Sequence, residues 1–174
     1  DLKPLERILF VKRHAFEPSH NYSVLLDSRW RPGGGIYTLA IPRDGKGLHP
    51  DQAVLTQLFD AKEGIARTPM ASFDGKTIWF SWRKSKDDTY HIYRMNADPS
   101  TSLRAGGSVQ QVTDGIWHDY WPCPLPDGGL AMVSSRCKAR YLCWRPQVSV
   151  LFRMDADGGN IRPLSFANLS EWSP

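Results

Sequence analysis

The side chains able to do chemistry are few in this sequence, and their spacing matches no metal-binding or catalytic pattern. The 174 residues include five histidines and three cysteines. Cys137 and Cys143 are six positions apart, which is neither the C-x-x-C spacing of zinc ligands nor the C-x-x-C-H motif of covalent haem. They either form a local disulfide in an exported protein or remain free thiols. No G-x-S-x-G is present to hold a serine nucleophile. We therefore expect no metal, no haem and no catalytic residue here.

The best candidate for a binding site is a segment that mixes aromatic and charged side chains, IWHDYWPC from Ile116 to Cys123. Its candidate contact residues are His118, Asp119, Tyr120 and Trp121. Aromatic side chains with charged neighbours are frequent where proteins recognise one another. The alternative is that these aromatic residues pack neighbouring parts of the fold and meet no partner.

A second candidate is a basic stretch that follows this segment. Its cationic residues are Arg136, Lys138, Arg140 and Arg145. The alternative is an exposed loop that is simply solvated. Over the whole chain, 22 Lys and Arg are mixed with 18 Asp and Glu, so charge does not predict nucleic-acid binding. No apolar run reaches the roughly 18 residues that a membrane-spanning segment needs.

The elements that must position these residues are indicated by an internal repeat. PMASFDGKTIWFSWR, residues 69–83, recurs as PCPLPDGGLAMVSSR, residues 122–136, and the two Asp-Gly pairs are 53 residues apart. YHIYRMNAD, residues 90–98, recurs as SVLFRMDAD, residues 149–157. The final EWSP matches the start of another unit, which places Glu171 and Trp172 where the candidate binding segment stands in the unit before.

Each repeat is typical of a small antiparallel sheet. Asp-Gly favours a tight turn, and the alternating residues after it predict a strand that is packed on both faces. We expect an all-β fold, a β-propeller fragment of about three four-stranded antiparallel blades. The approximate blades are residues 5–60, 65–115 and 118–166, and a further blade starts at 168–174. Propellers close with about four to eight blades, so we expect a piece of a longer protein.

Several of these motifs resemble known propeller families. SFDGKTIWFSWR, YHIYRMNAD and QQVTDG are similar to the repeats of TolB-type propellers, a branch related to WD40-like repeats. FVKRH, RPGGGIY, FSWR, DADGGNIRPLS and NLSEWSP together resemble the propeller region of the hydrazine synthase alpha subunit-like family of planctomycete-type bacteria. This second resemblance implies a c-type-cytochrome-associated redox parent whose haem motifs lie outside the repeats.

The resemblance implies a non-catalytic scaffold or protein-docking module within such a parent. Its partner would be another protein or a neighbouring domain of the same chain, and the protein would be periplasmic or otherwise exported. Two alternatives remain at this stage. One is a free-standing TolB-type interaction propeller of the cell envelope, and the other is a propeller that gates a downstream serine hydrolase domain.

Overall fold

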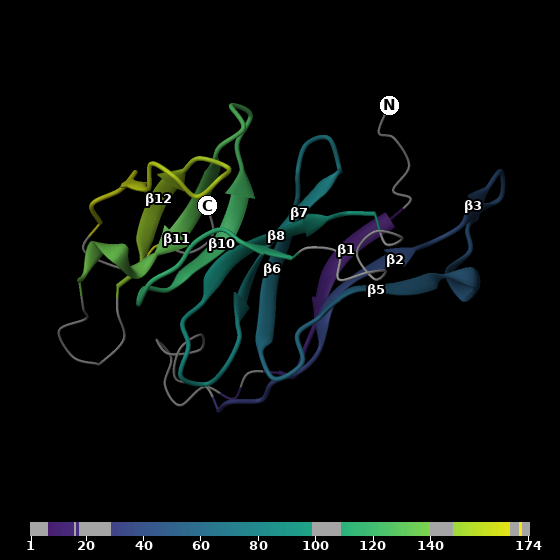
Figure 1. Ribbon diagram of the computed structural model, residues 1–174. Coiled ribbons are helices and arrows are strands. Elements are labelled where there is room, and N and C mark those ends of the chain that lie inside the picture. The colour runs from purple at the N-terminus through teal and green to yellow at the C-terminus, as the bar shows by residue number, and fades with distance from the viewer. Residues whose placement is uncertain are drawn as a thin grey trace.

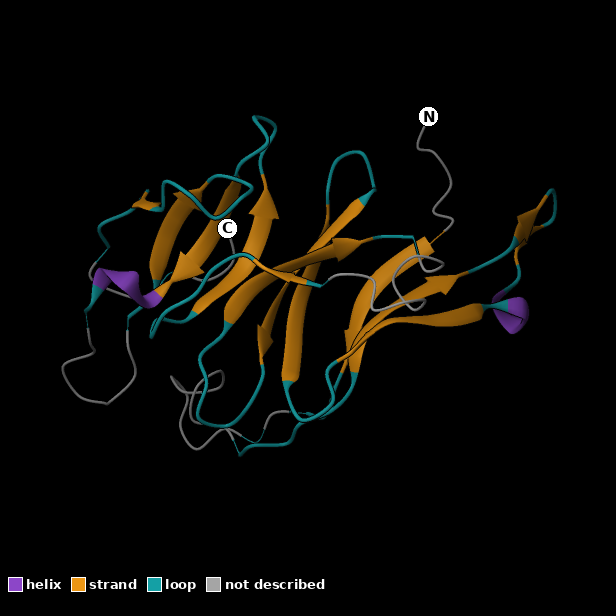
Figure 2. Ribbon diagram, in the orientation of Figure 1, coloured by secondary structure: helices purple, strands orange, loops and turns teal. Residues whose placement is uncertain are grey.

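The described residues form three larger antiparallel sheets, which follow one another along the chain and lie side by side (Figure 1), and one small two-stranded sheet. The structure is a computed structural model that describes residues 7–15, 17, 29–98, 109–139, 148–167 and 171. The only helical elements among these residues are two short 3-10 turns, η1 at Pro50–Gln52 and η2 at Ser135–Cys137 (Figure 2). The prediction of an all-β fold is confirmed.

The N-terminal sheet has three strands in the order β1-β2-β5. They are β1 (Arg7–Lys12), β2 (Gly35–Ala40) and β5 (Val54–Asp60). All three strands lie within residues 5–60, the range expected for the first blade. A hairpin of β3 (Arg43–Asp44) and β4 (Gly47–Leu48) separates β2 from β5 and was not predicted.

The second and third sheets have four strands each, connected in sequence order. The second consists of β6 (Ile65–Ala71), β7 (Thr77–Arg83), β8 (His91–Asn96) and β9 (Gln110–Gln111). The third consists of β10 (Asp119–Pro124), β11 (Leu130–Ser134), β12 (Val150–Met154) and β13 (Arg162–Pro163). β6 and β10 are the inner strands, since each one packs against the sheet before it.

The turn after the inner strand is one residue shorter in the third sheet than in the second. Both turns place a glycine at positive φ, Gly75 at 70° and Gly128 at 85°, as an Asp-Gly turn requires. Ile78 pairs with Met95 in the second sheet, whereas Leu130 pairs with Met154 in the third. The repeat offset is therefore 53 residues before the turn and 52 after it, and Arg83 and Arg136 are not structural equivalents.

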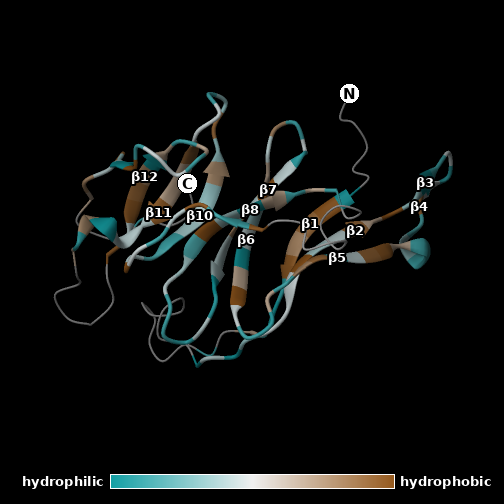
Figure 3. Cartoon of the chain, viewed as in Figure 1, coloured by the Kyte–Doolittle hydropathy of each residue, from teal (hydrophilic) through white to brown (hydrophobic). Residues whose placement is uncertain are grey.

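Two apolar clusters join the sheets, one on each face of the second sheet. Hydrophobic residues, brown in Figure 3, lie along the strands of all three sheets. Ile36 and Phe59 of the first sheet pack with Phe80 and Tyr93 of the second. On the opposite face, the second sheet contributes Trp79 and Ile92 to the cluster that fills the space before the third sheet. Burial of one large apolar side chain contributes roughly 1.5–3 kcal/mol, so these clusters hold the sheets together.

Both inner strands contain a bulge at the same place. Pairing of β6 with β7 shifts register between Arg67 and Met70, and pairing of β10 with β11 shifts between Tyr120 and Cys123. Thr68 and Trp121 occupy the bulges at positive φ, 46° and 61°. A bulge re-aims the strand and its side chains, so it determines where the candidate binding residues point.

The described residues contain no helix with the length and apolar character needed to cross a bilayer.

Candidate functional site

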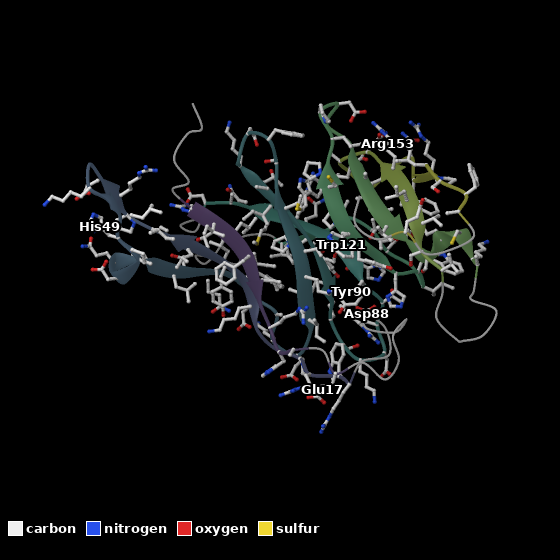
Figure 4. All side chains as sticks on the ribbon, turned by 180° about the vertical axis from the view of Figure 1, so that it is seen from behind. Glu17, His49, Asp88, Tyr90, Trp121 and Arg153 are labelled. Carbon is white, nitrogen blue, oxygen red and sulfur yellow. The ribbon has the colours of Figure 1, made fainter. Side chains whose placement is uncertain are left out.

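The predicted contact residues surround the start of β10, but two of them are buried. The side chains of Asp119 and Tyr120 belong to residues that are only 0% and 4% exposed. Trp121 is partly buried and its backbone N–H donates to Oγ of Ser81 at 3.0 Å. Figure 4 shows Trp121 and Tyr90 among the side chains in the middle of the molecule. Asp119 and Tyr120 therefore have structural positions and do not form an outer surface.

Asp119 forms a two-pronged ion pair with Arg136. Arg136 donates from Nε to Oδ1 at 3.0 Å and from Nη2 to Oδ2 at 2.7 Å. The hydroxyl of Ser134 also donates to Oδ1 at 2.6 Å. Because the carboxylate is buried, these charge-assisted bonds compensate its loss of water. The pairing joins two residues that the sequence analysis assigned to separate candidate sites.

The same arginine fixes the loop that leads into β10. Its Nη2 donates a further bond to the carbonyl oxygen of Asp114 at 2.8 Å. His118, at the end of this loop, donates its backbone N–H to Oγ of Ser135, and the backbone N–H of Ser135 donates to the carbonyl oxygen of His118, both at 3.0 Å. Loop 112–118 is thus tied to η2 at two points.

His118 is a neutral hydrogen-bond acceptor at this site. Its Nδ1 accepts the backbone N–H of Tyr90 at 3.1 Å. Burial lowers the pKa of His118 from its ordinary 6.5 to about 4, and the positive charge of Arg83 adds to this effect. An uncharged imidazole at neutral pH fits a role in holding the loop.

The exposed part of this region lies just before the predicted residues. Ile116 is 74% exposed, and Trp117 beside it is partly exposed. Lys138 is exposed, and its Nζ lies 5.9 Å from the centre of the Trp117 ring. We call Ile116, Trp117 and Lys138 the docking surface. It combines an apolar side chain, an aromatic ring and a cation, the chemistry expected of a protein-recognition site.

Glu171 occupies the position equivalent to Asp119. Its backbone N–H donates to the carbonyl oxygen of Ser149 at 2.8 Å, just as the N–H of Asp119 donates to that of Tyr90 at 2.8 Å. Its Oε2 accepts the backbone N–H of Leu151 at 2.7 Å. The backbone of Glu171 is therefore held in the same way as that of Asp119, the first residue of β10. The companion candidate, Trp172, lies outside the described residues.

The predicted basic loop and disulfide are only partly described. Arg136 is bound to Asp119 and does not contribute to a basic surface, whereas Lys138 does lie at the surface. Cys137 has no disulfide partner among the described residues, and its Sγ lies 3.2 Å from the carbonyl oxygen of Val148. The remaining candidates, Arg140, Arg145 and Cys143, lie outside the described residues. The pairing of Cys137 with Cys143 stays a prediction.

No group of three His, Cys, Asp or Glu side chains in the described part of the chain could share a metal ion. Donor geometry therefore gives no candidate metal centre among those residues.

Comparison with known proteins shows which proteins have a similar sequence and a similar arrangement of sheets. The chain matches no family model. An uncharacterised protein of Agrobacterium fabrum is 29% identical over 156 residues, which is 83% of this chain and 50% of the relative. A TolB-assigned structure from Agrobacterium tumefaciens has a TM-score of 0.53 at 28% identity, over 76% of this chain and 41% of that one. TolB from Acinetobacter baumannii has a TM-score of 0.47 at 19% identity, over 77% and 27%.

The sheets are blades of a β-propeller fragment that is similar to the TolB-assigned structure from Agrobacterium tumefaciens. The predicted fold class is thereby confirmed, with three strands described in the first blade and four in each of the others. The chain spans about half the length of the curated relative that it matches. The resemblance to the hydrazine synthase alpha subunit-like family stays a prediction.

Within the segment from Ile116 to Cys123, the structure exposes the residue Ile116 before the strand and buries Asp119 and Tyr120 at its start. The docking surface lies in the loop between the outer strand β9 and the next inner strand β10. Ile116 and Trp117 precede the strand, whereas Asp119 and Tyr120 are already part of it. The sequence contains one signal for the exposure of Ile116. Gly115, which has a φ of 99° in the structure, marks a loop, and an isoleucine that directly follows such a glycine has no neighbouring strand to cover it.

Proposed function

We propose that this propeller is a protein-docking module and that the docking surface contacts the partner. One observation carries the proposal: an exposed Ile116 and its neighbour Trp117 are presented by a loop whose base is fixed by a buried ion pair. A rigid loop loses little conformational entropy when a partner binds. Apolar and aromatic side chains held in this way are the usual centres of binding energy.

The chemistry of the surface indicates the kind of partner. Lys138 beside the Trp117 ring favours a carboxylate next to an apolar side chain. Asp119 and Arg136 support the loop without touching the partner, because each satisfies the other's charge. The proposed partner is therefore a protein or a neighbouring domain with a mixed apolar and acidic patch.

A photo-crosslinking amino acid at position 116 tests this proposal. We expect a specific crosslinked product in extracts of the source cells, and an at least tenfold lower yield (about 1.4 kcal/mol of binding) when Trp117→Ala is added. The matched control is the same crosslinker at Phe73, which is 76% exposed against 74% for Ile116 and lies in the turn at the opposite end of the second blade. Equal products from both positions, or no effect of Trp117→Ala, would reject the docking surface.

For the biological setting, we propose an exported parent of the hydrazine synthase alpha subunit-like type, supported by the resemblance of FVKRH, RPGGGIY and NLSEWSP. The module itself would bind no haem, since the sequence contains no C-x-x-C-H motif. Expression in a host that matures c-type cytochromes should give a protein without a Soret band. Covalently bound haem in the purified chain would contradict this part of the proposal.

A further inference from the structure

The first blade repeats the pairing of the second, strand for strand. Phe10 of β1 pairs with Tyr37 of β2, as Phe80 of β7 pairs with Tyr93 of β8. The ring centres are 6.0 Å apart at an interplanar angle of 29° in the first pair, and 5.9 Å and 27° in the second. β1 and β2 are therefore the equivalents of β7 and β8.

This equivalence relates two places at which one blade meets the next. Leu9 of β1 pairs with Thr38 of β2, just as Trp79 of β7 pairs with Arg94 of β8. Leu9 packs against the apolar cluster between the first and second blades, and Trp79 belongs to the cluster between the second and third. The two pairs can therefore be compared directly.

The place between the second and third blades is filled by two large side chains. Trp79 is buried, and the guanidinium carbon of Arg94 lies 5.7 Å from the centre of its indole ring. Nη1 of Arg94 donates to the carbonyl oxygen of Ala156 in the third blade at 3.3 Å. A cation that lies over an aromatic ring and bonds to the next blade therefore closes this contact.

The equivalent place between the first and second blades contains a cavity of about 590 Å³. Leu9 and Thr38 line it from the first blade, and Ile78 and Ala97 line it from the second. Leucine and threonine are much smaller than the tryptophan and arginine at the equivalent positions, so they do not fill the space. The volume lies within the roughly 300–1,000 Å³ that is usual for small-molecule sites.

The exposed rim of this cavity has an excess of positive charge. Arg7 and Lys76 line it, against one carboxylate, that of Asp98. Neither cation has a counterpart at the next contact. The equivalent of Arg7 is the neutral Thr77, and Lys76 is the additional residue of the longer turn in the second sheet. Asp74 adjoins Lys76 in sequence, but it is not among the lining residues and its carboxylate accepts two hydrogen bonds within the turn.

We propose that the cavity between the first and second blades binds a small carboxylic acid with an apolar body. Its carboxylate would lie between Arg7 and Lys76, because charge-assisted hydrogen bonds to these side chains stabilise an anion. Its apolar body would pack on Leu9 and Ile78, in the place that an indole ring and a guanidinium group take in the next contact. Both walls belong to neighbouring blades of this chain.

Calorimetric titration of the full-length protein with matched acids and alcohols tests the ligand class. The probes are octanoate and phenylbutyrate, each compared with its alcohol, octanol or phenylbutanol. At least one acid should bind, with a dissociation constant at least about tenfold lower than that of its alcohol, because only the acid pairs with the rim cations. Absence of binding by both acids, or equal affinity for acid and alcohol, would overturn the proposal.

A cavity-filling variant locates the site. Leu9→Trp combined with Thr38→Arg introduces the two residue types that fill the next contact, and it should weaken acid binding at least about tenfold. The matched control is Leu48→Trp, which alters an exposed leucine in the β3–β4 hairpin and should leave the affinity unchanged. Full acid binding by a folded double variant would show that the acid binds elsewhere.

A charge variant tests the rim without altering the packing between blades. Lys76→Gln, in an exposed turn, should weaken acid binding roughly fivefold and leave alcohol binding unchanged. Lys46→Gln makes the same change in the β3–β4 hairpin and should have no effect. An unchanged acid affinity in Lys76→Gln, or an equal loss for acid and alcohol, would contradict the proposed role of the rim. The outcome is independent of the docking surface, which lies at the opposite end of the second blade.

Discussion

His118, Asp119 and Arg136 show how residue types suited to recognition can instead serve the structure. Each has a charged or polar group, yet each is committed to a partner inside the protein. Asp119 and Arg136 are 17 positions apart in the sequence, and no local pattern indicates that they meet. Their contribution to binding is indirect, because they hold the loop that carries Ile116 and Trp117.

The lowered pKa of His118 gives a testable dependence of stability on pH. The folded protein holds this side chain neutral with a pKa of about 4, whereas the unfolded chain takes up a proton near 6.5. The unfolded state therefore binds the proton more readily, and stability should fall as the pH drops from about 6.5 to 4. The full shift corresponds to roughly 3 kcal/mol.

Urea unfolding at a series of pH values measures this effect. His118→Gln keeps a side-chain acceptor for the N–H of Tyr90 but cannot titrate, so its stability should fall less over the same interval. An equally steep loss in His118→Gln would show that other groups cause the pH dependence.

At the scale of the elements, the sequence predicted the strands well and their irregularities poorly. Alternating apolar residues and Asp-Gly turns predicted β7, β8 and β11, because period-2 patterning and positive-φ glycine are local properties. The bulges at Thr68 and Trp121 were not predicted, since neither residue type favours positive φ. Tertiary contacts stabilise them: the Oγ of Ser81 lies 2.9 Å from the Oγ1 of Thr68 and accepts the N–H of Trp121.

The start of β10 also decides which residues of the candidate segment are exposed. A regular strand from Ile116 would alternate its side chains between two faces and leave either His118 and Tyr120 or Asp119 and Trp121 at the surface. The strand instead begins at Asp119 and shifts register after Tyr120. The exposed residues are consequently displaced into the preceding loop.

Among the described residues, apolar side chains are more completely buried in the second blade than in the first. The second blade has an apolar cluster on each face, whereas the first blade has an open face at Ile8 and Leu55 and an open edge at β1 within the described residues. In a fold built of repeated units, each unit is stabilised mainly by its neighbours. The blades should therefore differ in local stability even though their strands pair alike.

Native-state hydrogen exchange tests this order. We expect amides of β2 to exchange at least tenfold faster than amides of β7 and β8. The reason is that local opening of the first blade exposes less of the apolar surface that is buried in the folded protein. The comparison of β2 with β8 is matched, since both are the strand after the β1 or β7 position and both have neighbours on each side. Equal exchange in the two strands would mean that the blades unfold as one cooperative unit.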